Sequence, residues 1–145
     1  LYQTEAAARV GAEAIQIVYN RLDRKGEEAV LPSCARQGLG VLARVPLASG
    51  YLSGKYKPGT TFPDGDVRAA RDPSKEDETL GEIERIAATE VPEGVHMAPW
   101  ALAWCLQHPA VSCVIPGCKT VTQVISNDEA TKLDMLRSDH PQAVT

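Results

Sequence analysis

The sequence from residue 111 to residue 127 is VSCVIPGCKTVTQVISN. Its first part is apolar and rich in β-branched residues, which predicts a buried strand, and Pro116-Gly117 ends that strand. Thr120 and Gln123 have the spacing of a capping box, so we expect a short helix to begin at this point. The stretch therefore predicts a strand, a glycine turn and the N-terminus of a helix.

The N-terminus of this predicted helix would suit an anion such as a phosphate group. Its first backbone N–H groups have no partner within the helix, the helix dipole is positive there, and Lys119 adds a full charge. An ordinary strand-to-helix turn without a ligand would have the same local pattern, and the stretch alone favours this simpler interpretation. The rest of the sequence has to decide between the two.

Composition limits the class of protein. The chain has 145 residues, of which 43% are hydrophobic and 23% charged, as expected for one globular domain with a core. A net charge of −4 and scattered Lys and Arg residues argue against a nucleic-acid or an anionic membrane surface as partner. Because no segment resembles a signal peptide or a membrane-spanning helix, we expect a cytoplasmic protein.

The cysteines give no sign of a metal site. They lack C-x-x-C spacing and a nearby pair of histidines, and they stand at positions 34, 105, 113 and 118. In a cytosolic protein this arrangement predicts reduced and mostly buried thiols. We therefore expect no metal ligands in this chain.

Helical and strand patterns alternate along the chain. Apolar spacing predicts helices at residues 4–12, 27–37, 74–89, 97–107 and 128–136, and strands at residues 14–19, 40–45 and 111–115. The helix at 97–107 is apolar on nearly all sides and should be buried. Continuously apolar strands between helices predict an α/β fold with a parallel sheet. Three strands form a small sheet, whose two edges stay unpaired unless another chain covers them.

Residues 57–73 have a different composition. Pro58-Gly59, the segment 63–66 and Asp72-Pro73 are turn signals in series, with few apolar residues between them. This pattern predicts a long surface loop. A loop of this length in a compact domain is expected to be either functional, such as a lid over a site, or flexible.

Four motifs carry a resemblance to a known family. They are Q-x-x-Y-N at residues 16–20, P-L-A-S-G-x-L-x-G-K-Y at 46–56, A-L-A-W at 101–104, and V-I-P-G-x-K-T-x-x-Q-x-x-x-N at 114–127. In this order and spacing they closely resemble the second half of the aldo-keto reductases, over nearly all of residues 1–145. The resemblance implies part of a (β/α)8 TIM barrel, with the last three parallel strands and their outer helices. It also implies NADP(H) bound at the C-terminal ends of the strands, for hydride transfer to an aldehyde or ketone.

The resemblance implies a role for several residues near the nicotinamide and the pyrophosphate. Gln16 matches the residue that hydrogen-bonds the nicotinamide carboxamide; the alternative is a polar residue in a buried strand, which would need a partner of its own. Arg44 stands where many relatives have an aromatic residue stacked on the nicotinamide, and a guanidinium can also lie flat on a ring. Leu47, Ser49 and Gly50 match the segment along the pyrophosphate.

The same resemblance assigns the adenosine end of the cofactor to residues 117–127. Gly117, Lys119 and Thr120 match the loop that holds the 2′-phosphate, and Gln123 and Asn127 match residues on the adenine side. Lys119 favours NADP over NAD because a cation near the ribose meets the additional phosphate. Gln123 and Asn127 are four residues apart, so one helical face can present both.

The catalytic residues of the family are not among these motifs. In the family a Tyr acts as general acid beside a Lys, an Asp and a His, all drawn from the first half of the barrel. The resemblance therefore implies that this chain is a C-terminal fragment of an NADP(H)-dependent oxidoreductase, with much of the cofactor site and negligible activity alone. The alternative is a non-catalytic half-barrel that forms a homo-oligomer through its exposed strand edges.

Overall fold

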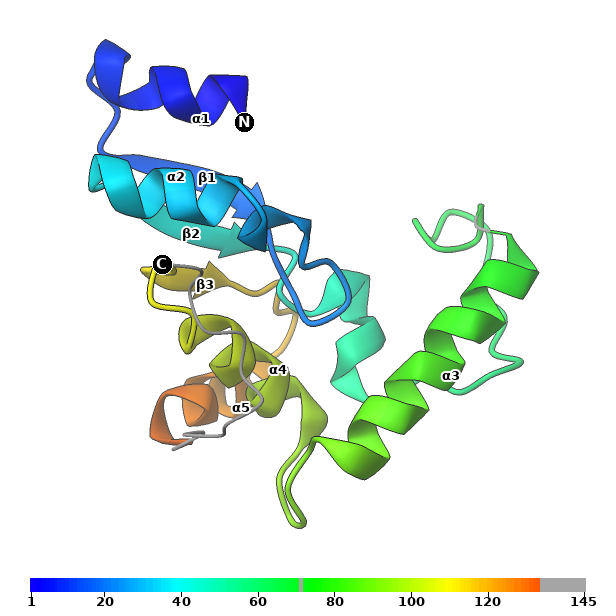
Figure 1. Cartoon of the computed structure of the whole chain (residues 1–145). Coiled ribbons are helices and arrows are strands. Elements are labelled where there is room, and N and C mark those ends of the chain that lie inside the picture. Colours follow the sequence, from blue (N-terminus) through cyan, green and yellow to red (C-terminus); the bar gives the residue numbers. More distant parts are fainter. Residues whose placement is uncertain (71, 134–145) are drawn as a thin grey trace.

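The centre of the fold is a three-stranded parallel sheet. The computed structural model describes residues 1–70 and 72–133 of the chain. Strand β1 (Ala14–Val18) pairs with β2 (Gly40–Arg44), and β2 pairs with β3 (Cys113–Ile115), so the order is β1-β2-β3 (Figure 1). Both pairings are parallel, which confirms the predicted α/β class and the partial barrel architecture.

The helices follow the predicted alternation with the strands. The α-helices are α1 (Tyr2–Ala7), α2 (Val30–Gln37), α3 (Pro73–Thr89), α4 (Met97–Leu106) and α5 (Val121–Asp128), and the short 3-10 helices are η1 (Ala8–Val10), η2 (Lys25–Glu27), η3 (Ala48–Ser53) and η4 (Glu129–Lys132). The prediction of a helix that begins at residue 128 is wrong, because α5 ends at Asp128 and the 3-10 helix η4 follows it. Residues 134–136 of the predicted helix lie outside the described residues. Helix α3 extends away from the sheet, beside η3 (Figure 1).

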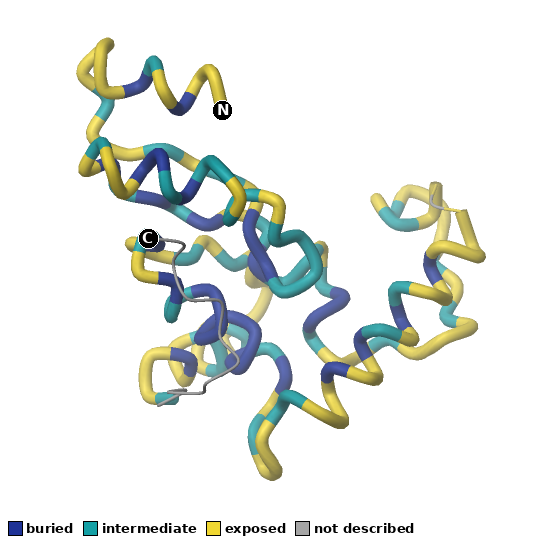
Figure 2. The backbone as a smooth tube through the Cα atoms, in the orientation of Figure 1, coloured by how far each residue is buried: buried dark blue, intermediate teal, exposed yellow. Residues whose placement is uncertain are grey.

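Helix α4 forms the centre of the core, as its apolar sequence predicts. Its residues from Pro99 to Cys105 are buried, and Leu102 is fully buried (Figure 2). Tyr19, which follows β1, packs its ring 5.4 Å from that of Trp104. The helix therefore needs no polar face, because the sheet and the neighbouring helices surround it.

The burial of the strands differs from the prediction. Only β2 has fully buried side chains, those of Val41 and Ala43, whereas β1 and β3 alternate between exposed and half-buried residues. The reason is position in the sheet, since β1 and β3 are its two edges and each lacks a neighbouring strand on its outer side. The prediction of mostly buried thiols is wrong for the same region, because Cys113 and Cys118 are exposed.

The connection between η3 and α3 has no helix or strand in its described residues. In this connection Phe62 packs against Tyr56, with ring centroids 5.1 Å apart, and against Tyr51 of η3, with ring centroids 6.0 Å apart. At the start of α3, Glu76 is buried and accepts a hydrogen bond from the hydroxyl of Tyr51. Tyr51 of η3 therefore contacts both the loop, through Phe62, and the start of α3, through Glu76. None of the helices in the described residues has the length and apolar character needed to cross a membrane.

The dominance of α4 in the core leads to a stability prediction. Replacing Leu102 by Ala removes fully buried methyl groups and should lower the free energy of unfolding by about 2–5 kcal/mol. Urea unfolding followed by circular dichroism measures the change. The control is Val121→Ala, at a side chain that is 75% exposed, for which we expect a change within about 0.5 kcal/mol. Equal effects of the two variants would contradict the assignment of α4 as the centre of the core.

Candidate functional site

A large cleft lies at the C-terminal ends of the three strands. Its volume is about 1480 Å³, and it is lined by Gln16 of β1, Arg44 of β2 and Ile115 of β3. From the strand ends it continues along η3 and the first residues of α4 to α5. Parallel strands present their carboxyl ends at one edge of a sheet, and ligands of α/β proteins bind at this edge.

The cleft brings together the predicted site residues, with one exception. Those that line it are Gln16, Arg44, Leu47, Ser49, Gly50, Gly117, Lys119, Gln123 and Asn127. Thr120 is the exception: its hydroxyl oxygen accepts a hydrogen bond from the Gln123 backbone N–H at 3.2 Å and so caps α5. Residues more than 100 positions apart in the sequence, such as Gln16 and Lys119, thus face the same space.

Two hydrogen bonds of Gln123 build the turn before α5. Thr120 caps the helix as its spacing predicts, and Gln123 Oε1 accepts a hydrogen bond from the Lys119 backbone N–H at 2.6 Å. The side-chain oxygen of Gln123 is therefore engaged in holding the turn. Gly117 and Lys119 remain exposed at the rim of the cleft.

The segment after β2 has an unusual backbone. Val45, Ala48 and Ser49 have φ angles of 55°, 48° and 58°, and Gly50 follows with 91°. Left-handed conformations are uncommon for residues with a Cβ and concentrate at functional sites. The succession turns the chain sharply at the mouth of the cleft, so that this segment lines it.

Sequence reasoning missed Arg68, which comes from the long loop and lines the cleft beside Ser49. Its guanidinium lies 4.1 Å from the ring centroid of Phe62 and 4.5 Å from that of Tyr56. Arg68 also donates two hydrogen bonds of 2.7 Å to the Asp66 carboxylate, which lower the pKa of Asp66 to about 2. The available signal was the presence of Arg68 and the aromatic Phe62 in one loop rich in Pro and Gly, shortly after Tyr56.

Positive side chains outnumber negative ones along the cleft. The cations that line it are Arg44, Lys55, Arg68 and Lys119, and the carboxylates are those of Glu93 and Glu129. In the described residues, no group of three or more His, Cys, Asp or Glu side chains is placed to hold a metal ion. A long cleft lined with separated cations suits an extended ligand that carries several negative charges.

Comparison with known proteins agrees with this architecture. The sequence model of the Aldo/keto reductase family matches residues 2–144. A probable voltage-gated potassium channel subunit beta of Oryza sativa subsp. japonica is 34% identical over 141 residues, which cover 93% of this chain and 42% of the relative. An aldo-keto reductase of Schizosaccharomyces pombe, yakc, is 30% identical over 139 residues, covering 90% of this chain and 40% of the relative.

A solved structure gives the same result. The holo form of aldo-keto reductase AKR11C1 from Bacillus halodurans superimposes with a TM-score of 0.70 at 25% identity, over 96% of this chain and 43% of that one. The chain thus spans about two fifths of the length of the relatives that it matches. From the family match over nearly every residue and the shared fold, we conclude that this chain belongs to the aldo/keto reductase family.

Proposed function

We propose that this chain binds NADP(H) along the cleft and forms the cofactor-binding part of a carbonyl-reducing oxidoreductase. The observation that carries the proposal is the single cleft that gathers Gln16, Arg44, Ser49, Lys119 and Asn127 at the C-terminal ends of the parallel strands. By the resemblance of the motifs, each of these residues stands at a cofactor position of the family, with Arg44 in place of the aromatic residue that many relatives have there. Their convergence supports a common ligand over a set of unrelated local roles.

The proposed cofactor follows the cleft from the sheet to α5. Gln16 and Arg44 would hold the nicotinamide, the segment 47–50 the pyrophosphate, and Gly117 with Lys119 the 2′-phosphate. Gln16 is exposed, which argues against the alternative of a polar side chain buried within a strand. Arg68 extends the set: its guanidinium, which is paired with Asp66, also donates a hydrogen bond of 3.4 Å to the Ser49 carbonyl, so we propose that it holds the pyrophosphate segment in place.

Bound NADPH would supply a hydride for the carbonyl carbon of an aldehyde or ketone. The residues of this chain bind and orient the cofactor in this proposal, and proton donation to the carbonyl oxygen belongs to the Tyr, Lys, Asp and His set of the family. Because none of the motifs in this chain carries that set, we propose that the chain alone does not reduce carbonyl compounds.

The role of Lys119 can be tested by cofactor discrimination. We expect the chain to shift NADPH fluorescence at high micromolar concentration, and we expect Lys119→Ala to weaken NADPH binding about fivefold or more. The affinity for NADH should change less than twofold, because NADH lacks the phosphate that the ammonium group would meet. The control is Lys75→Ala at an exposed residue of α3. Absence of any fluorescence change with the unmodified chain would refute the proposed function.

The proposed lack of catalysis has its own measurement. General acid catalysis is typically worth about 10² to 10⁴-fold, so an aldehyde mixed with NADPH and this chain should lose NADPH no faster than the uncatalysed mixture. A full-length aldo-keto reductase under the same conditions is the positive control. Turnover that scales with the concentration of this chain would show that the proton donor is supplied by residues outside the motifs of the family.

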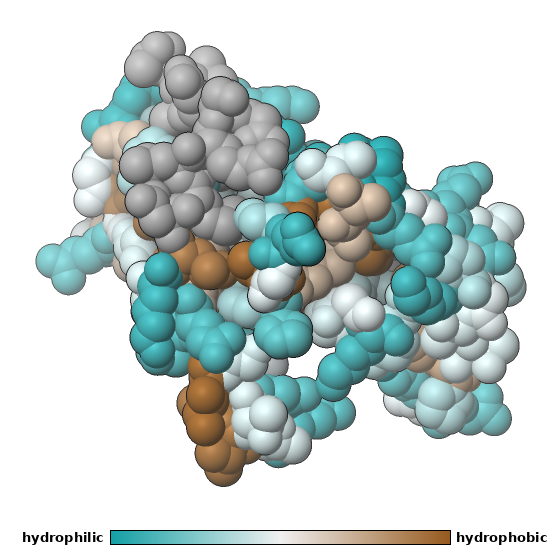
Figure 3. Space-filling view, turned by 90° about the horizontal axis from the view of Figure 1, so that it is seen from below, coloured by the Kyte–Doolittle hydropathy of each residue, from teal (hydrophilic) through white to brown (hydrophobic). Residues whose placement is uncertain are grey.

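A second candidate function is assembly with another copy of this chain. Both β1 and β3 are sheet edges in the described structure, and Val18 and Ile115 at their carboxyl ends are 37% and 39% exposed. Apolar side chains also reach the surface between polar ones on the face shown in Figure 3. Unpaired strand edges with apolar side chains favour pairing with another strand.

This candidate predicts concentration-dependent association. Sedimentation velocity at high micromolar concentration should show a dimer, and Val18→Lys should shift it toward the monomer because a charge at a strand edge opposes pairing. The control is Val67→Lys in the long loop, where the side chain is 79% exposed and far in sequence from either edge strand. A monomer at every concentration, or equal dissociation by both variants, argues against assembly through the edges.

A further inference from the structure

The backbone of Val45 is held in a conformation that its side chain disfavours. Its φ angle is 55°, and a β-branched residue at positive φ is a genuine outlier. Val45 follows the last residue of β2 and lines the cleft. Such a conformation persists only when the surrounding structure determines it, so a specific contact should hold Val45 in place.

That contact comes from Asn20, which is only 3% exposed. Its side-chain Nδ2 donates a hydrogen bond of 3.0 Å to the carbonyl oxygen of Val45. The pairing of β1 with β2 ends with Val18 beside Arg44, and the Tyr19 N–H then donates to the Arg44 carbonyl at 3.3 Å. Asn20 therefore adds a hydrogen bond from its side chain one residue further along, where β1 and β2 no longer pair through their backbones.

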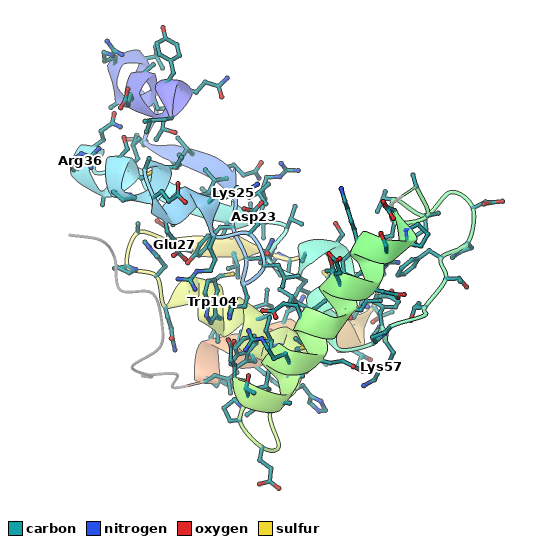
Figure 4. The ribbon with its side chains drawn as sticks, turned by 45° about the vertical axis from the view of Figure 1, so that its right-hand side comes forward. Asp23, Lys25, Glu27, Arg36, Lys57 and Trp104 are labelled. Carbon is teal, nitrogen blue, oxygen red and sulfur yellow. The ribbon has the colours of Figure 1, made fainter. Side chains whose placement is uncertain are left out.

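Asn20 is itself fixed by its own turn. Its Oδ1 accepts hydrogen bonds of 2.9 Å from the backbone N–H groups of Leu22 and Asp23. The preceding Tyr19 is fully buried and donates a hydrogen bond of 2.8 Å to Glu27, which lies near Trp104 in Figure 4. The amide of Asn20 thus reaches Val45 from a rigid support.

The same carbonyl of Val45 controls the turn that enters the cleft. Besides Asn20, it accepts a hydrogen bond of 2.9 Å from the Ala48 N–H, which closes the turn before Ser49 and Gly50. Ser49 and Gly50 line the cleft in the segment proposed to follow the pyrophosphate. A change in the orientation of this carbonyl would therefore move the backbone that faces the cofactor.

We propose that Asn20 is a positioning residue for the cofactor: it holds the Val45 carbonyl so that the segment after β2 is ordered before the ligand binds. The inference rests on the proposed function, since it concerns the same cleft. In this proposal the buried side-chain amide of Asn20, in the turn after β1, contributes to the free energy of cofactor binding without touching the cofactor. Ordering of the segment in advance would lower the entropic cost of binding.

The test is Asn20→Asp, which keeps the acceptor for Leu22 and Asp23 and removes the donor to Val45. We expect NADPH to bind about tenfold more weakly. The apparent affinity is proportional to the fraction of molecules in which the segment is already ordered, and this variant lowers that fraction. Asp23→Asn, in the same turn, is the matched control and should leave the affinity unchanged. If Asn20→Asp does not fold, Asn20→Ser is used in its place. Its hydroxyl is a short acceptor that cannot reach Val45.

A rescue experiment separates positioning from general damage. Glycine adopts positive φ without strain, so the effect of Asn20→Asp should fall below about threefold in a Val45→Gly background. An equal loss of NADPH affinity in both backgrounds would overturn the proposal. The amide exchange rate of Ala48, measured by nuclear magnetic resonance without cofactor, should rise in Asn20→Asp and return toward normal in the double variant.

The exchange measurement also distinguishes the two proposals. If no variant and not even the unmodified chain binds NADPH, the proposed function fails, while the exchange of Ala48 still reports whether Asn20 holds the turn. If NADPH binds and neither its affinity nor the exchange of Ala48 depends on Asn20, the positioning role fails alone. Each outcome thus decides one of the two statements.

Discussion

The parallel pairing of β2 with a strand on each side is the constraint on which the arrangement of the cleft depends. Because β1, β2 and β3 run in the same direction, the residues that follow them meet at one edge of the sheet. The turn after β1, the segment after β2 and the loop after β3 are separated by tens of residues in the sequence. Side chains of β1, of the segment after β2 and of the loop after β3, such as Gln16, Ser49 and Lys119, can address one extended ligand only through this pairing.

Much of the architecture follows from residue patterns that act locally. The apolar surface of α4 on all sides predicts its burial, and α2 ends at residue 37 as predicted, with Gly38 in a left-handed conformation after it. Thr120 caps α5 at the predicted position. These features depend only on residues within one or two helical turns, so they can be predicted from the local sequence.

Other features depend on contacts that the local pattern does not contain. The strand at residues 14–18 is apolar enough to be central, yet it lies at an edge, because strand order is a property of the whole sheet. Arg68 enters the cleft through the packing of a long loop on Tyr56 and Phe62, and Gln123 turns its oxygen toward Lys119. The support of Val45 by Asn20 spans 25 residues and requires the two strand ends to be adjacent.

The sheet has a consequence for the order of folding. Strands β1 and β2 lie close in sequence, with only η2 and α2 between them. Strand β3 joins β2 across a long connection, as the hydrogen bond of Ser112 with Val41 over 71 residues shows. Closing a longer loop costs more chain entropy, and contacts between distant residues slow folding. We therefore expect the β1-α2-β2 unit to form early and β3 to dock later. The loop that follows β3 would then be the last wall of the cleft to assemble, so a ligand that spans it would select molecules that have completed folding.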